Sequence, residues 1–119
     1  MEGQDQESRS KVIQVDSKET WDSYLSQAAT QGSPIVAHFT AAWCMVSVLM
    51  NTYLEEYAAT YPDILFLRVD VDDVKVVAKK YEIKAMPTFL MIKGGGEAVE
   101  KKMVGANPEE IKKGIEALL

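Results

Sequence analysis

The sequence predicts an α/β domain built on one mixed sheet, with helices covering both faces of the sheet. Strand-like apolar runs alternate with segments of helical periodicity through the first two thirds of the chain. The last third holds two further strand patterns, joined across consecutive glycines, and then one amphipathic helix. This βαβαβα-ββα order predicts parallel strands in the first part of the sheet and an antiparallel pair at its end.

Length, composition and charge indicate one globular domain that does not bind polyanions. The 119 residues, 47% hydrophobic and 26% charged, suit a single core. The net charge of -5 argues against nucleic acid and acidic membrane surfaces as partners. Residues 1–10 are polar and predict a loose tail, and residues 11–119 form the domain. We expect a monomer.

The cysteine content and the polar start of the chain bear on its location. A lone cysteine cannot form an internal disulfide, and no apolar leader segment follows Met1. No apolar run is long enough to span a membrane, and Glu2 stands where N-myristoylation requires glycine. We therefore expect a reducing, cytoplasmic location.

The first elements alternate between strand and helix. Residues 12–15 form a short strand, and Asp16 and Glu19 have capping-box spacing for a helix that ends at Gly32-Ser33-Pro34. The nearly continuous apolar run from Ile35 to Thr40 predicts a central strand covered on both faces. The inner face of the helix carries Trp21, Leu25 and Ala28.

A longer helix, another strand and a short helix follow. Apolar residues spaced by three and four predict a helix from Ser47 to about Tyr61, which Pro62 ends. A strand over residues 64–69 leads to Asp72 and Asp73, which can cap the short helix. The buried sides of the two helices are predicted to carry Met50, Tyr53, Leu54, Tyr57, Ala58 and Tyr61, and Val74, Val77, Ala78 and Tyr81.

The last third of the chain reads as an antiparallel hairpin and a helix. Residues 88–92 and 99–104 are strands, and the glycines at 94–96 permit the turn between them. Asn107 is the predicted N-cap of the last helix, and Pro108 takes its first position. The buried residues of this helix are Ile111, Ile115 and Leu118.

The chemistry-bearing feature is Cys44, placed where the central strand turns into the long helix. A thiolate at a helix N-terminus meets unpaired N–H groups and the positive end of the helix dipole, so its pKa falls. The alternative is a buried, inert cysteine. Ser47, three residues on, can donate a hydrogen bond to the thiolate, cap the helix, or do both.

Four segments carry further information when they are taken together and in order: Phe39-Thr40-Ala41-Ala42-Trp43-Cys44, Leu65-Phe66-Leu67-Arg68-Val69-Asp70-Val71-Asp72, Ala85-Met86-Pro87-Thr88-Phe89 and Val104-Gly105-Ala106. They resemble the thioredoxin family, especially the plant h-type and its monothiol Cys-x-x-Ser subgroup. The resemblance covers about Val12 to Leu119 and implies the thioredoxin fold. In the family one cysteine attacks a substrate disulfide, a second resolves the mixed disulfide, and a cis proline, matched by Pro87, flanks them.

The chain departs from this family pattern at several positions. Ser47 replaces the resolving cysteine, Met45 and Val46 replace Gly-Pro, and Thr52 replaces a proline of the active-site helix. Several departures favour natural divergence over an engineered trap, in which the second cysteine alone would change. The effect of Met45 and Val46 on the pKa of Cys44 has no predicted direction.

His38 stands where the family keeps a buried aspartate. It is either a neutral, hydrogen-bonded core residue or a proton donor and acceptor near the thiol. Arg68 matches the basic partner of that aspartate and is expected to face solvent, because a histidine offers it no attraction.

The resemblance also implies a docking surface beside the thiol. A cis Met86-Pro87 peptide would leave the backbone of Met86 free to pair with a substrate strand. One cysteine and one histidine are no metal ligand set, so no metal or bound cofactor is expected. The implied surface consists of Trp43, Met45, Val46, Ala85, Met86, Pro87, Gly105 and Ala106.

These features predict a monothiol thiol–disulfide oxidoreductase or disulfide isomerase in cell redox homeostasis. Cys44 attacks a protein disulfide or a glutathionylated protein, and glutathione or a substrate thiol resolves the product. Coupling to thioredoxin reductase is expected to be weak or absent, because no internal disulfide forms. The alternative is a non-catalytic thioredoxin-fold module that binds proteins or peptides and in which Cys44 is incidental.

Overall fold

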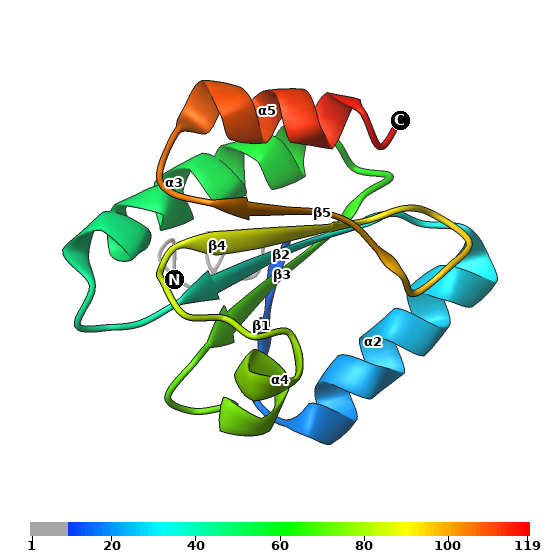
Figure 1. Cartoon of the computed structure of the whole chain (residues 1–119). Helices are drawn as coiled ribbons and strands as arrows, with labels where there is room; N and C mark the ends of the chain where they lie inside the picture. Colours follow the sequence, from blue (N-terminus) through cyan, green and yellow to red (C-terminus); the bar gives the residue numbers. More distant parts are fainter. Residues whose placement is uncertain (1–9) are drawn as a thin grey trace, which may run out of the picture.

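The computed structural model describes residues 10–119 and shows a five-stranded sheet between two layers of helices (Figure 1). Residues 1–9 of the predicted tail lie outside the described part of the chain. Among residues 10–119, no helix is long and apolar enough to cross a membrane. The elements are β1 (Val12–Val15), α2 (Lys18–Gln31), β2 (Ile35–Thr40), α3 (Met45–Thr60), β3 (Leu65–Asp70), α4 (Lys75–Lys80), β4 (Thr88–Ile92), β5 (Val99–Val104) and α5 (Pro108–Glu116).

The strand order β1-β3-β2-β4-β5 places β2 at the centre of the sheet. β3 pairs in parallel with both β1 and β2, whereas β4 runs antiparallel to β2 and to β5. The predicted fold class and the hairpin are therefore confirmed. β2 ends at Thr40, so the loop that carries Cys44 leaves from a central strand that is paired on both sides.

The sheet separates two hydrophobic cores. α3 and α5 cover one face and α2 and α4 the other, as Figure 1 shows. Side chains of a strand point alternately to its two faces, so Val36 joins the α3/α5 core while Ile35, Ala37 and Phe39 join the α2/α4 core. All six residues of β2 are buried, as the nearly continuous apolar run predicts.

Two predicted helix caps are wrong. The N-cap of α2 is Ser17, whose hydroxyl accepts from the Thr20 N–H at 3.1 Å, while Asp16 accepts from the Thr20 hydroxyl. Before α4, the carboxylate of Asp70 accepts from the N–H groups of residues 72 and 73, so the two aspartates there do not cap the helix. Several adjacent Ser and Asp residues offer equivalent acceptors, and the local turn selects among them.

The long helix starts earlier than predicted. α3 begins at Met45 with Cys44 as its N-cap residue, after a turn in which the Cys44 N–H donates to the Ala41 carbonyl at 3.0 Å. Ser47 therefore lies inside the first turn, completely buried. Tyr53, predicted to be buried, is 40% exposed, because its spacing from Met45 places it on the outer side of the helix.

Candidate active site

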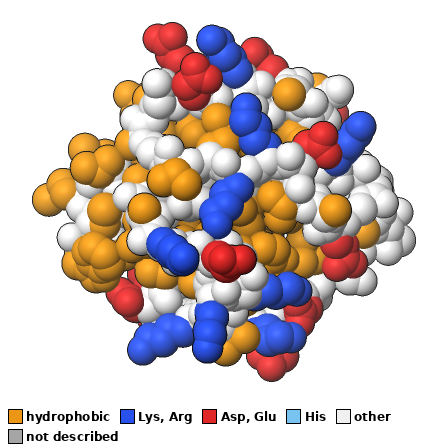
Figure 2. All heavy atoms as spheres, viewed as in Figure 1, with side chains coloured by type: hydrophobic (Ala, Val, Ile, Leu, Met, Phe, Trp, Pro, Cys, Tyr) orange, Lys and Arg blue, Asp and Glu red, His pale blue; other side chains and the backbone are white. Residues whose placement is uncertain are grey.

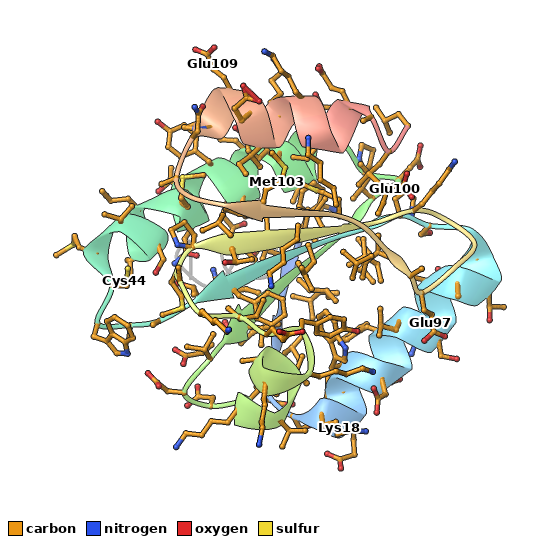
Figure 3. All side chains as sticks on the ribbon, viewed as in Figure 1. Lys18, Cys44, Glu97, Glu100, Met103 and Glu109 are labelled. Atoms are coloured by element: carbon orange, nitrogen blue, oxygen red, sulfur yellow. The ribbon has the colours of Figure 1, made fainter. Side chains whose placement is uncertain are left out.

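The Cys44 thiol lies at one end of the sheet, where α3 begins (Figure 3). Its backbone is extended, with φ -101° and ψ 98°, and its side chain is partly exposed. The Sγ atom donates to the carbonyl oxygen of Met86 at 3.6 Å. The thiol is therefore accessible and adjoins the loop that precedes β4. This contradicts the alternative of a buried, inert cysteine.

The start of α3 lowers the pKa of the Cys44 thiol from its ordinary value. The largest cause is the backbone N–H of Ser47, followed by the Ser47 hydroxyl, and the backbone N–H of Val46 adds to both. Partial desolvation acts in the opposite direction and is outweighed. A helix N-terminus stabilises anions through such unpaired N–H groups, so the thiolate fraction at neutral pH exceeds that of a free cysteine.

Ser47 is buried and hydrogen-bonded at the junction of β2 and α3. Its Oγ donates to the Cys44 carbonyl at 2.9 Å, with the Ala41 carbonyl at 3.3 Å as a second acceptor. It also accepts from the Ala41 N–H at 3.3 Å and shares a 2.9 Å hydrogen bond with the Thr40 hydroxyl. A hydroxyl carries one hydrogen, so donation to the Cys44 thiolate competes with these acceptors. Ser47 is not the N-cap of α3.

Two loops meet beside the thiol. The Met86-Pro87 peptide is cis, and the carbonyl of Pro87 accepts from the N–H of Gly105 at 3.0 Å. Gly105 has φ +117°, a conformation that residues with a Cβ rarely adopt. These contacts place Cys44, Met86, Pro87 and Gly105 at one surface, as the sequence resemblance implies.

The residues of the predicted docking surface differ in how they can contact a partner. Trp43 is 68% exposed, Met45 72% and Val46 51%, whereas Pro87 is buried. Ala85 and Ala106 are exposed, and Met86 is partly so. Pro87 therefore acts by shaping the backbone, and the exposed apolar side chains supply contact area.

Sequence reasoning missed two residues of this region. The Trp43 indole donates to the carboxylate of Asp72 at 2.8 Å, which fixes an otherwise exposed ring. Asp72 follows β3, whose C-terminal end lies beside that of its parallel neighbour β2, and this adjacency was the available signal. Thr40, the partner of the Ser47 hydroxyl, is the last residue of β2.

His38 is buried on the α3/α5 side of the sheet. Its ring stacks on Phe89 with centroids 4.7 Å apart, and neither ring nitrogen has a hydrogen-bond partner within residues 10–119. Desolvation, reinforced by the charge of Arg68, lowers the pKa of His38 to about 3. Of the two alternatives for His38, the structure favours the neutral core residue, but the hydrogen bonding expected with it is wrong.

Arg68 is half-buried and does not simply face solvent. It lies beside His38 in the sheet register, and its Nε donates to Gln14 Oε1 at 2.7 Å. Lateral pairing across β1 and β3 brings these polar side chains together. The guanidinium therefore has a partner in place of the family's aspartate.

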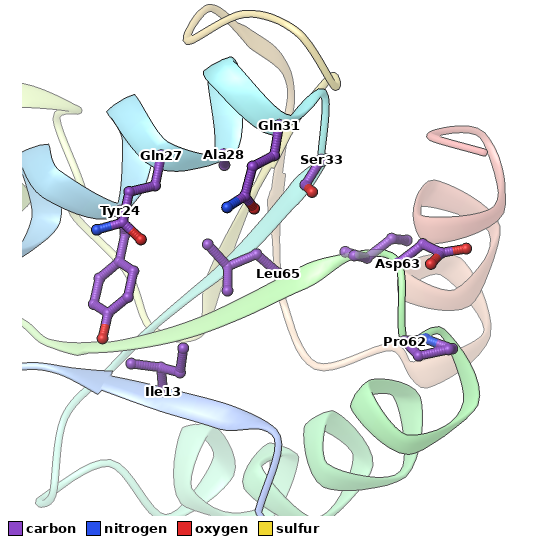
Figure 4. A pocket seen from close by; sticks show the side chains of 10 residues that line it. Ile13, Tyr24, Gln27, Ala28, Gln31, Ser33, Pro62, Asp63 and Leu65 are labelled. Carbon is purple, nitrogen blue, oxygen red and sulfur yellow. The ribbon is translucent and has the colours of Figure 1, made fainter.

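We searched the rest of the described chain for a competing metal site or pocket. Within residues 10–119, no three His, Cys, Asp or Glu side chains form a group that could hold a metal ion. A hollow beside α2, lined by Tyr24, Gln27, Gln31 and Asp63 among others, does not include Cys44 (Figure 4). The thiol remains the chemically distinctive group.

The fold and this thiol site are those of a protein of the thioredoxin family. The thioredoxin family model matches residues 12–117, and the chain belongs to that family. Because Cys44 is its one cysteine, it is a monothiol thioredoxin-like redox protein. Proteins of the family act on protein disulfides.

Particular relatives sharpen this assignment. The chain is 55% identical over 109 residues to thioredoxin-like protein CXXS1 of Arabidopsis thaliana, covering 92% of this chain and 91% of that protein. Identity to the CXXS1 protein of Oryza sativa subsp. japonica is 53% over 108 residues, with 91% and 80% covered. The crystal structure of a poplar thioredoxin h superposes with a TM-score of 0.84 at 37% identity, covering 91% of this chain and 96% of that one.

Removing the Ser47 hydroxyl will raise the pKa of Cys44 without restoring that of a free thiol. The hydroxyl is the second-ranked cause of the lowered pKa, and the backbone N–H groups stay in Ser47→Ala. The measurement is the rate of alkylation by iodoacetamide against pH. Thr40→Val, which removes the other hydroxyl of the pair, serves as control and shifts the profile less. An unchanged profile in Ser47→Ala contradicts the assigned cause.

Acidification will destabilise the protein through His38. The histidine pKa is about 3 in the folded state and near its ordinary 6.5 when unfolded, so below pH 6.5 the unfolded chain binds the extra proton. Stability therefore falls as the pH falls, by about 2 kcal/mol between pH 7 and pH 5. Urea unfolding at both pH values measures this loss.

The matched variant for this measurement is His38→Val. His38 is the chain's one histidine, so the variant keeps no side chain with an ordinary pKa near 6.5 and its stability should change little between pH 7 and pH 5. A wild-type loss of stability that persists in the variant would assign it to other groups.

Proposed function

We propose that this protein is a monothiol thiol–disulfide oxidoreductase whose second half-reaction is performed by glutathione. In the first step the Cys44 thiolate attacks the glutathione sulfur of a glutathionylated protein. A new sulfur–sulfur bond forms, the old one breaks, and the protein sulfur leaves as a thiolate. A second glutathione thiolate then attacks the Cys44–glutathione disulfide, which yields oxidised glutathione and free Cys44.

A protein disulfide is the other substrate of the same thiol. Attack by Cys44 leaves one substrate sulfur as a thiolate and the other bound to Cys44. Glutathione resolves this intermediate, or the substrate's own free thiol attacks it and closes a different disulfide. The second route is isomerisation and needs no net electron donor.

The contrast between Cys44 and Ser47 carries the proposal. Cys44 has a lowered pKa and partial exposure, as an attacking thiolate requires. Ser47 is fully buried and its oxygen is engaged with the backbone, and a hydroxyl cannot displace a thiolate in any case. His38 supports the same reading, because a buried ring with a pKa of about 3 stays neutral and unprotonated at working pH.

The proposal has consequences for electron supply and location. Thioredoxin reductase acts by reducing an internal disulfide, which one cysteine cannot form, so coupling to it is weak or absent. The acting thiol is glutathione, which is abundant in reducing compartments, and we place the protein in the cytoplasm as a monomer.

Turnover of a glutathionylated model protein tests this function. With glutathione present, wild-type protein releases oxidised glutathione catalytically, while Cys44→Ser does not accelerate the reaction over the buffer rate. The assay couples oxidised glutathione to glutathione reductase and follows the consumption of NADPH. A wild-type protein that is no faster than Cys44→Ser and the buffer contradicts the proposal and leaves the non-catalytic binding module as the remaining function.

Ser47→Cys is the complementary arm of the same experiment. It restores the second thiol, so reduction of a protein disulfide by thioredoxin reductase without glutathione should appear or increase. If it does not, Met45, Val46 or His38 impose a further block on dithiol chemistry.

A further inference from the structure

The exposed hydrophobic side chains of this protein are unevenly distributed. Within residues 10–119, six of the ten large exposed hydrophobics fall between positions 43 and 53. α3 carries no charged side chain before Glu55. In Figure 2 hydrophobic side chains gather at the left, over the N-terminal half of α3. The six are Trp43 at 68%, Met45 at 72%, Val46 at 51%, Val48 at 37%, Leu49 at 62% and Tyr53 at 40% exposure.

Three of them form a stripe along the outer side of α3. Met45, Leu49 and Tyr53 are spaced by four residues, which aligns them on one side of a helix. The opposite side buries Ser47, Met50 and Leu54 against the sheet. The stripe residues are thus not members of the buried core, although the Tyr53 ring lies 6.4 Å from that of the core residue Tyr57. We call Met45, Leu49 and Tyr53 the outer α3 stripe.

This stripe is continuous with the surface around the thiol. Its first residue, Met45, directly follows Cys44. Along the helix axis Leu49 lies about 7.5 Å and Tyr53 about 13.5 Å from Cys44, at about 1.5 Å per residue. An extended chain advances about 3.3 Å per residue, so for a substrate chain that runs along α3 the stripe lies opposite positions roughly two to four residues from the attacked cysteine.

The charges near the two ends of the stripe are mostly acidic. At the thiol end, Asp72 is bonded to the Trp43 ring, and Asp70 accepts from the N–H groups of Asp72 and Asp73. At the other end, Glu55 and Glu56 follow Tyr53 in the helix. A basic side chain, Lys84, precedes Ala85 on the other side of the thiol. Apolar contact flanked by negative charge favours a partner segment that is apolar and, where charged, basic.

We propose that the outer α3 stripe is a substrate-selecting surface for polypeptide segments with apolar residues two to four positions from the reacting cysteine. Acidic residues at those positions are disfavoured. This proposal rests on the proposed function, since it assigns the substrate class that the Cys44 thiol receives. Leu49 is its centre, because it is well exposed and lies one turn beyond the docking residues next to the thiol.

Peptide disulfides with a shared leaving group separate recognition from thiol reactivity. Each test peptide carries one cysteine linked to 2-nitro-5-thiobenzoate, flanked at positions two to four by leucines, serines, lysines or glutamates. Attack by Cys44 on the peptide sulfur forms the mixed disulfide and releases the coloured nitrothiobenzoate thiolate. Each rate is divided by the same variant's rate with the nitrothiobenzoate disulfide of free cysteine, which is too small to reach Leu49.

The wild-type protein should prefer the leucine peptide to the serine peptide, and the glutamate peptide should be slowest. Leu49→Ser lowers the normalised rate with the leucine peptide by about three- to tenfold. This is the effect expected when one partly buried contact between leucine side chains is lost. Leu119→Ser is the matched control, because Leu119 is 70% exposed at the chain's C-terminal end, far from Cys44 (Figures 1 and 3). It leaves the preference unchanged.

Two outcomes overturn the proposal in distinguishable ways. Equal normalised rates for all peptides, or a leucine preference that survives in Leu49→Ser, show that the stripe selects nothing while Cys44 still reacts. Absence of reaction with the small cysteine disulfide as well means that the proposed function itself fails.

Discussion

The hydrogen-bond cluster around Ser47 is the constraint on which the site depends. One buried hydroxyl joins the Thr40 side chain, the Ala41 backbone and the Cys44 carbonyl, so it ties the end of the central strand to the first turn of α3. Buried polar groups cost free energy when left unpaired, and this arrangement satisfies the hydroxyl within the protein. The same first turn presents the N–H groups that lower the pKa of Cys44. Strand end, helix start and thiol chemistry are therefore one local structure.

The chemistry of the site follows from what this cluster keeps and what it lacks. The helix start still lowers the pKa of the attacking Cys44 thiol. At the position of the resolving cysteine, however, Ser47 has an oxygen in place of the second sulfur. His38, stacked on Phe89 beneath α3, is too strongly desolvated to carry a proton at neutral pH. Exposed Trp43 and Met45 lie beside the thiol, and further exposed apolar residues follow along α3. We infer a protein that binds and attacks disulfides but depends on another molecule for release.

Much of this could be predicted from the sequence, because the fold is encoded in patterns with strong periodicity. The apolar run of β2, the glycine turn before β5 and the Asn107-Pro108 helix start all appear as expected. The failures are local. Neighbouring hydroxyls and carboxylates compete for the same orphan N–H groups, so Ser17 and not Asp16 caps α2. Helical spacing alone did not show that Tyr53 lies on the outer face of α3. The hydrogen bond between Trp43 and Asp72 was missed because the two residues are far apart in sequence.

The lifetime of an isolated mixed disulfide tests the central claim most directly. Cys44 is coupled to a peptide whose single cysteine leaves no second thiol, excess reagents are removed, and the adduct is followed by mass spectrometry at neutral pH. The account predicts that the adduct persists without added thiol and is cleaved when glutathione is supplied, with recovery of free Cys44. Spontaneous loss of the peptide in the absence of any external thiol would show that the chain resolves its own intermediate and would contradict the account.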